Sequence, residues 1–213
     1  MSGEVCLQGG GELSPGCEAM DAAMLARADG SPRRVVVAPF AGRPGREQAM
    51  ASANARRWYL ALGALEVRTA TPEAGDLADA LADAELLVIP GGSPTRLLEA
   101  LAPHVDLLRA ASARGLAISG ASAGAMVLCR WTVLPEGRPR VVPALGLVDV
   151  DLVLPHHRPG ARGWLDLARP ALADDAVVIG LPERSGVVLH DNGRRSAVGV
   201  QPAVDLRIAD TAT

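Results

Sequence analysis

Residues 120–124, Gly-Ala-Ser-Ala-Gly, form the clearest chemical pattern in the sequence. The pattern fits G-x-S-x-G, follows the apolar run 116–119 and opens a helical pattern at 125–129. A serine in such a strand-to-helix turn is exposed above the end of its strand, and the flanking glycines avoid Cβ clashes. The spacing therefore predicts Ser122 as a nucleophile for acyl transfer. The alternative is a junction of small residues with an ordinary serine.

A serine nucleophile needs a base at neutral pH, and the chain has four histidines. His104 lies in a connection between helical patterns and His190 lies beside a hairpin turn, so both are expected to be solvated. His156 and His157 follow the apolar run 151–154. Because α/β sheets place their sites at the carboxyl ends of strands, one of these two histidines is the predicted base.

A carboxylate is expected to orient the histidine and to stabilise its charged form. Glu183 follows the apolar run 177–181, again at the end of a predicted strand. Glu136, Asp149 and Asp151 compete with it if the acid precedes the histidine in the chain. Spacing alone leaves this choice open.

Two glycine-rich turns also follow apolar runs. Residues 90–93, Pro-Gly-Gly-Ser, open a helix, and glycines there let a backbone N–H approach a reacting carbonyl. A backbone N–H of this turn is therefore predicted to donate a hydrogen bond to an oxyanion, as the second donor beside the N–H of Ala123. Residues 9–12, Gly-Gly-Gly-Glu, lack the G-x-G-x-x-G order of a dinucleotide loop and are interpreted as a tight structural turn.

Short apolar runs alternate with helical patterns along the chain. Buried strands are expected at 34–40, 86–90 and 116–119, with helices near 17–28, 46–62, 95–102 and 106–114. Further strands are expected at 131–134, 141–142, 152–154, 177–181 and 186–190, with a helix at about 162–172 and a hairpin turn at 190–193. This alternation predicts an α/β fold, a mostly parallel sheet with helices on both faces, in a single domain over residues 1–213.

Composition excludes several function classes. A formal net charge of −3 gives no field that would attract nucleic acid or an anionic membrane. Lysine is absent, which excludes a lysine base, a Schiff base and a Walker-type phosphate lysine. Three cysteines without metal-ligand spacing predict no disulfide framework and a reducing compartment. With no signal-peptide pattern and no run of 18 apolar residues, a cytoplasmic location is expected.

Five segments, taken in order, resemble the serine peptidase family of aspartyl dipeptidase (peptidase E) and cyanophycinase. They are the initial Gly-Gly-Gly-Glu, PGGSPTRLLEAL at 90–101, SGASAGAM at 119–126, LPHH at 154–157 and GLPERSGVV at 180–188. The resemblance implies a class I glutamine amidotransferase-like fold, which is a flavodoxin-like three-layer sandwich. By position it implies a triad of Ser122, His156 and Glu183, with Gly92 and Ala123 as the oxyanion donors.

The resemblance further implies a small-peptide substrate, a homodimer, and no metal or organic cofactor. Its positions make Gly91, Ser93, His157 and Arg162 the predicted substrate contacts. A guanidinium such as that of Arg158 or Arg162 suits a substrate carboxylate because it can bind both oxygens. Cyanophycinases carry Asp-Gln-His-Phe where this chain has Leu-Pro-His-His, which disfavours cleavage of an aspartate–arginine polymer.

The sequence thus predicts a serine-type peptidase that hydrolyses small peptides and resembles aspartyl dipeptidases. The alternative is a non-catalytic protein that binds a small ligand or a partner on the same scaffold. Glutamine amidotransfer would need a cysteine in place of Ser122, and an α/β-hydrolase esterase would place its acid before its histidine.

Overall fold

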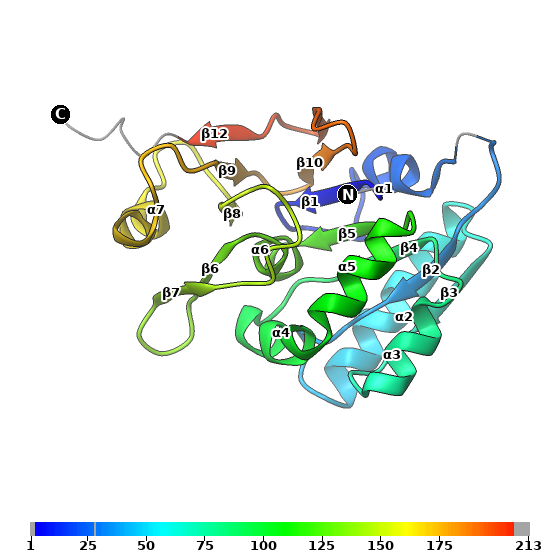
Figure 1. The fold of residues 1–213 in the computed structure, drawn as a ribbon. Helices are drawn as coiled ribbons and strands as arrows, with labels where there is room; N and C mark the ends of the chain where they lie inside the picture. Colours follow the sequence, from blue (N-terminus) through cyan, green and yellow to red (C-terminus); the bar gives the residue numbers. More distant parts are fainter. Residues whose placement is uncertain (1–2, 28, 207–213) are drawn as a thin grey trace.

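The computed structural model describes residues 3–27 and 29–206 (Figure 1). Within these residues the main sheet has seven strands, which are β1 Val5–Gln8, β2 Arg34–Val37, β3 Glu66–Thr69, β4 Leu86–Ile89, β5 Ala117–Ala121, β10 Ser185–Leu189 and β11 Arg195–Gly199. Their order is β11-β10-β1-β5-β4-β2-β3. Strands β1, β5, β4, β2 and β3 are parallel, and β10 and β11 are antiparallel to their neighbours.

Helices cover both faces of this sheet. One core cluster lies under α1 (Glu18–Leu25) and α2 (Arg46–Ala61). The other includes residues of α3 Ala74–Leu81, α4 Pro94–Leu101, α5 Val105–Ala113 and α6 Ala123–Leu128. In β2, Val35 and Val37 belong to the first cluster and Val36 to the second, because successive side chains of a strand point to opposite faces. The predicted three-layer α/β fold is confirmed.

Two small sheets follow α6 in the chain. Strands β6 (Trp131–Leu134) and β7 (Arg140–Pro143) form an antiparallel hairpin. The other sheet has the order β12-β9-β8, with bounds β8 Leu152–Pro155, β9 Val178–Leu181 and β12 Val204–Leu206. Figure 1 shows the β6–β7 hairpin and α7 (Gly163–Ala168) on the side of the molecule away from β3. Strands β8 and β9 are parallel, so their carboxyl ends lie together.

A polar cluster is buried between the main sheet and α1 and α2. The Asp21 carboxylate accepts hydrogen bonds from Gln8 Nε2 (2.8 Å), Trp58 Nε1 (2.8 Å) and the Tyr59 hydroxyl (3.1 Å). Gln8 Nε2 also lies 2.8 Å from the Ser119 hydroxyl oxygen. Asp21 is 1% exposed, and its burial raises the pKa of the carboxyl despite these hydrogen bonds. The cluster joins α1 and α2 to the carboxyl ends of β1 and β5.

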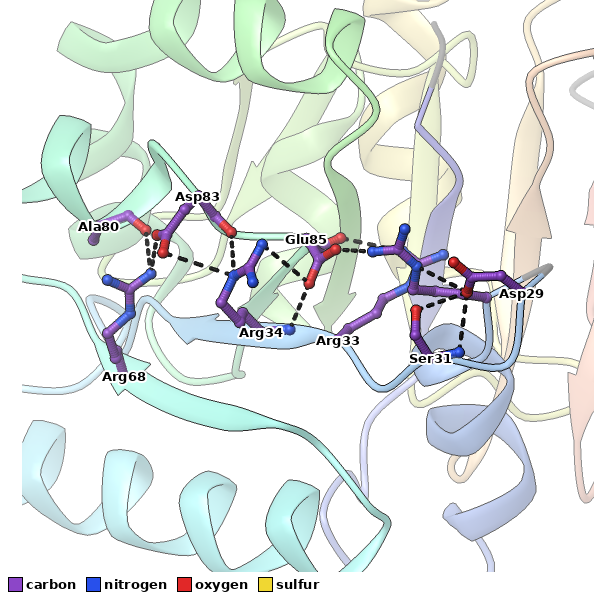
Figure 2. Close-up of polar contacts among 9 residues, drawn as sticks. Asp29, Ser31, Arg33, Arg34, Arg68, Ala80, Asp83 and Glu85 are labelled. Carbon is purple, nitrogen blue, oxygen red and sulfur yellow. Dashed lines mark hydrogen bonds and ion pairs between the residues drawn. The ribbon is translucent and has the colours of Figure 1, made fainter.

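Charged side chains form ion pairs at the amino-terminal ends of the parallel strands, opposite the Asp21 cluster (Figure 2). Arg34 lies between Asp83 (Nε to Oδ2, 3.7 Å) and Glu85 (Nη2 to Oε2, 3.6 Å). Arg68 pairs with Asp83, and Arg33 Nη1 donates to the Glu85 carbonyl at 3.1 Å. These ion pairs are partly exposed and connect β2, β3 and β4 at the edge where the chain enters them.

Cys6, Cys17 and Cys129 are free and buried, which agrees with the predicted lack of a disulfide framework among them. Burial, the largest cause, raises the pKa of the Cys6 and Cys129 thiols far above their usual value. Within the described residues, no helix is both long enough and apolar enough to cross a lipid bilayer.

Candidate active site

Ser122 lies in a strained turn between β5 and α6. Its φ is +48° and its ψ is −109°, a backbone conformation that residues other than glycine rarely adopt. The glycines two residues away make the turn possible. A Cβ on Gly120 would lie 2.7 Å from the carbonyl carbon of Gly124, and a Cβ on Gly124 would lie 2.2 Å from Ile89 O. The G-x-S-x-G spacing therefore reflects two close backbone contacts around the serine.

The side chains of Ser122, His156 and Glu183 form one hydrogen-bonded chain. Ser122 Oγ lies 2.9 Å from His156 Nε2, and His156 Nδ1 lies 3.1 Å from Glu183 Oε1. With Nδ1–H donating to the carboxylate, Nε2 is free to accept the serine proton, which is the tautomer that a general base requires. The His156 side chain is 47% exposed and that of Glu183 is 56% exposed, so a peptide can reach the site from solvent.

These residues come from the carboxyl ends of strands in two different sheets. Ser122 follows β5 of the main sheet, whereas His156 follows β8 and Glu183 lies two residues after β9 in the small sheet. As expected, the three residues lie at the carboxyl ends of strands. These strands belong to two sheets, however, so the three residues do not share the edge of one sheet. Because Pro155 pairs with Leu181 in the parallel strands β8 and β9, His156 and Glu183 lie at the same level along these two strands.

Backbone carbonyls of the first turn hold all three segments together. The carbonyls of residues 8, 9 and 10 accept hydrogen bonds from the N–H groups of Ser122 (2.9 Å), His156 (2.8 Å) and Arg184 (2.7 Å), in that order. We call residues 8–10 the carbonyl frame. It spans the gap between the main sheet and the small sheet, and it fixes the backbone at or beside each member of the hydrogen-bonded chain.

The glycines of the frame allow close packing. A Cβ on Gly9 would lie 2.1 Å from Pro182 O, and a Cβ on Gly10 would lie 2.3 Å from His156 Cε1. The interpretation of this turn as structural is correct, but its contact with His156 was not predicted. A run of three glycines directly after a buried strand was the signal, since glycine tolerates such approaches.

The two predicted oxyanion donors flank Ser122. Ala123 is the first residue of α6, where an N–H has no partner within its helix. Gly92 has a φ of +140°, and a Cβ there would lie 2.9 Å from Ala41 O. Among residues 3–27 and 29–206, neither N–H has a hydrogen-bond partner. Unpaired N–H groups at these two positions are what the predicted oxyanion role requires.

A carboxylate that the sequence did not reveal lies beside Ser122. Gly91 N–H donates to Glu12 Oε1 at 2.8 Å. A Cβ on Gly91 would lie 2.9 Å from that oxygen and 3.1 Å from Ser122 Cβ, so Glu12 and Ser122 border the same small space. Glu12 ends the Gly-Gly-Gly-Glu segment, but nothing in its spacing connects it to residue 91.

Ser93 binds Glu136, one of the competing acids. The Ser93 hydroxyl caps α4 by accepting from Arg96 N at 3.3 Å, and it donates to Glu136. Thr95 Oγ1 donates to the other carboxylate oxygen at 2.6 Å. Burial acts to raise the pKa of Glu136, but the hydrogen bonds from Ser93 and Thr95 outweigh it and lower the pKa. Glu136 thus lies on Ser93, next to the predicted oxyanion donor Gly92, rather than on His156.

The remaining competing acids lie elsewhere. Asp149 and Asp151 both pair with Arg130, and Asp151 also accepts from Val177 N at 2.8 Å. Of the four carboxylates considered from the sequence, Glu183 is the one hydrogen-bonded to His156.

His157 and Arg162 lie beyond His156, away from the hydrogen-bonded chain. A Cβ on Gly180 would lie 2.7 Å from the His157 ring, so the ring packs on β9. Burial lowers the pKa of His157, which keeps it neutral near pH 7. Arg162 precedes α7 and, with His157, lines a cavity of about 410 Å³.

The other two histidines do not contact Ser122. His104 Nε2 lies 3.1 Å from Pro72 O at the surface. The expectation that His190 is solvated is wrong, because its side chain is only 15% exposed and hydrogen-bonds Glu4 (2.7 Å) and Ser196 (2.8 Å). This ring bridges the start of β1 and the β10–β11 hairpin.

Comparisons with known proteins identify the family and structures of similar fold. The family model for peptidase family S51 matches residues 5–196. The structure is similar to that of a peptidase from an acI-B1 Actinobacterium, with a TM-score of 0.77 and 20% identity over 99% of this chain and 96% of that one. It is also similar to a putative peptidase E protein from Listeria monocytogenes EGD-e, with a TM-score of 0.63 and 15% identity over 96% of this chain and 98% of that one.

No curated protein sequence matches the chain. The family match covers the main sheet up to the start of β11, the β8–β9 pair and the segments that carry Ser122, His156 and Glu183. The resemblance seen in the sequence is confirmed: the chain belongs to peptidase family S51 and is a serine-type peptidase.

Proposed function

We propose that this peptidase hydrolyses small peptides with Ser122 as nucleophile, His156 as general base and Glu183 as the acid that orients His156. The hydrogen-bonded chain of 2.9 Å and 3.1 Å through these three side chains carries the proposal. The chemistry is acyl transfer to water. The proposed triad needs no group that the chain does not itself supply.

In the first step Ser122 Oγ attacks the scissile carbonyl while His156 Nε2 takes its proton. The carbonyl oxygen becomes an oxyanion, and the N–H groups of Gly92 and Ala123 donate to it. His156 then gives the proton to the leaving amine, and the C–N bond breaks. His156 then deprotonates a water molecule that attacks the acyl-enzyme carbonyl. The ester C–O bond to Ser122 Oγ breaks, Oγ takes the proton back from His156, and the acid is released.

Two carboxylates near the oxyanion donors support a substrate with a free amino terminus. Glu12 borders the space beside Ser122, and Glu136 lies on Ser93 next to Gly92. In a dipeptide the ammonium group is one carbon from the scissile carbonyl, so it would lie next to these carboxylates. Peptides without that positive charge would leave Glu12 without a cationic partner.

The remaining substrate contacts belong to the same proposal. Gly91 leaves room beside Ser122, Ser93 lies next to the oxyanion donors, and His157 and Arg162 line the far side of the site. We assign Arg162 to a substrate carboxylate, since the described residues offer its guanidinium no ion-pair partner. Dipeptides that begin with aspartate are the first candidates, and we expect a cytoplasmic homodimer.

The experiment compares four proteins on a dipeptide set, with kcat and KM measured by release of free amino acids. We expect Ser122→Ala to lower kcat at least about 10³-fold and Glu183→Gln to lower it by a similar factor. Glu136→Gln is the matched control, because it removes a nearby carboxylate charge without touching His156. Full activity of Ser122→Ala, or equal losses in the two glutamine variants, would contradict the proposal.

A further inference from the structure

A second cavity of about 380 Å³ adjoins His156 on the side of α7. Besides the two neighbouring histidines, its lining residues are Leu154, Pro155, Ala161, Gly163 and Trp164. We call this cavity the Trp164 pocket. None of its lining residues is an acid or an arginine. Burial lowers the pKa of His157, which favours its neutral form, so the pocket offers no carboxylate or guanidinium to pair with a charged side chain.

The lining residues of the Trp164 pocket differ in how deeply they are buried. Leu154 and Pro155 end β8 and are buried, so they form a rigid floor. Trp164 is half-buried in the first turn of α7 and packs against the core. Ala161 is exposed at the mouth, in the loop between the histidines and α7. A side chain that enters between Ala161 and Trp164 would leave water for an apolar surface.

The proposed mechanism decides which part of a substrate meets this pocket. Gly92 and Ala123 would hold the acyl carbonyl on one side of Ser122. His156 must give its proton to the leaving amine, so that amine and the residue attached to it lie beside the imidazole. The Trp164 pocket shares His156 with the triad, whereas Glu12 and Glu136 lie on the acyl side.

We propose that the Trp164 pocket binds an apolar side chain of the leaving-group residue, the residue whose amine is released. This inference rests on the proposed function and adds a substrate class to it. A cavity of this size can hold a leucine or phenylalanine side chain. A charged side chain would lose its hydration there without gaining an ionic partner.

The first test measures kcat/KM for dipeptides that differ only in the second residue. Aspartate, alanine and leucine serve in turn as the first residue, and the second is Leu, Phe, Gly, Asp or Arg. For whichever first residue is cleaved, we expect Leu and Phe to exceed Gly, Asp and Arg by about 10- to 100-fold, the range typical of apolar pockets.

Substitutions at the mouth assign that preference to this pocket. Ala161→Trp should fill the pocket and lower the ratio of Phe to Gly substrates by about tenfold. Ala161→Asp adds a carboxylate and should raise the ratio of Arg to Phe substrates. Ala171→Trp is the matched control, since Ala171 is exposed just after α7 and lines neither cavity near His157. It should leave both ratios unchanged.

The outcomes distinguish failure of the pocket assignment from failure of the proposed function. If dipeptides are cleaved with no preference at the second residue, or if Ala161→Trp and Ala171→Trp behave alike, the pocket assignment is wrong while the hydrolase stands. If wild type cleaves no dipeptide, the proposed function fails, and calorimetry of Ser122→Ala with Asp-Phe and Asp-Gly decides the pocket. Tighter binding of Asp-Phe supports the assignment, and equal or absent binding overturns it.

Discussion

Gly10 lies so close to the His156 ring that a side chain at this position would displace it. We expect Gly10→Ala to displace the His156 ring, since the new Cβ would lie 2.3 Å from Cε1, and to lower kcat about 100-fold. Gly115→Ala is the control, because its φ of +105° is close to the +112° of Gly10 but its Cβ meets nothing within 4 Å. Steady-state kinetics on one dipeptide measures both. Equal kcat in the two variants would show that only backbone strain matters.

At Glu12, substitution can separate the effect of the negative charge from the effect of the hydrogen bond to Gly91. Glu12→Gln keeps an oxygen that can accept from Gly91 N–H but removes the negative charge beside Ser122. We expect KM for dipeptides with a free amino terminus to rise about tenfold, with kcat changed much less. Glu99→Gln, an exposed change on α4, is the control. An unchanged KM for Glu12→Gln would argue against recognition of the ammonium group.

For single residues, the sequence predicts a place in the candidate site when a local pattern of neighbouring residues indicates it. The small residues around Ser122 and the strand ends before His156 and Glu183 are such local patterns. The sequence offers Glu136 as a competing acid and does not single out Glu12. Both acquire their positions through contacts with residues 91 and 93, which are distant in the chain, so no spacing could predict those positions.

Among the elements, α1 and α2 are joined to β1 and β5 by the buried Asp21 cluster. Asp21→Ala would leave the Gln8, Trp58 and Tyr59 donors without their acceptor, and we expect it to lower the free energy of unfolding by about 2–4 kcal/mol. Tyr59→Phe removes one of these hydrogen bonds and should cost about 1 kcal/mol. Urea unfolding measures both, and equal losses would contradict the shared role of the carboxylate.

The pH dependence of the same variants has a definite sign. The folded protein raises the pKa of Asp21, mainly through burial, so it holds this proton more tightly than the unfolded chain. The contribution of Asp21 to stability is fully present below its unfolded pKa of about 3.9 and declines as pH rises through the folded value. The stability difference between wild type and Asp21→Ala should therefore be smaller at pH 7.5 than at pH 4.5.

Elements with continuous apolar runs were predictable, and others were not. β4 and β5 are buried along their whole length, as their sequences indicate. Helix α3 is built from alanine, glycine, aspartate and leucine without a strong apolar run, and the short strand β12 is largely exposed. Helix α7 is shorter than expected, because a 3₁₀ turn at Arg169–Ala171 that contains a proline follows it.

For the whole molecule, the two core clusters offer a test of the single predicted domain. Cys6 belongs to the cluster under α1 and α2, and Cys129 belongs to the cluster on the other face. In a Cys17→Ser background, both buried thiols should become reactive to maleimide at the same urea concentration, as measured by mass spectrometry. Two separate midpoints would instead indicate two units that unfold independently.

The carbonyl frame also bears on how such an enzyme can change its specificity. Every residue type supplies a carbonyl, so the anchoring of the three reactive segments depends on backbone path and on small residues at 9 and 10 rather than on particular functional groups. Laboratory evolution could therefore randomise the loop at 158–163 and the turn at 135–139, which face the substrate in our proposal. The frame would be untouched, and libraries built in this way should retain a high fraction of folded, reactive clones.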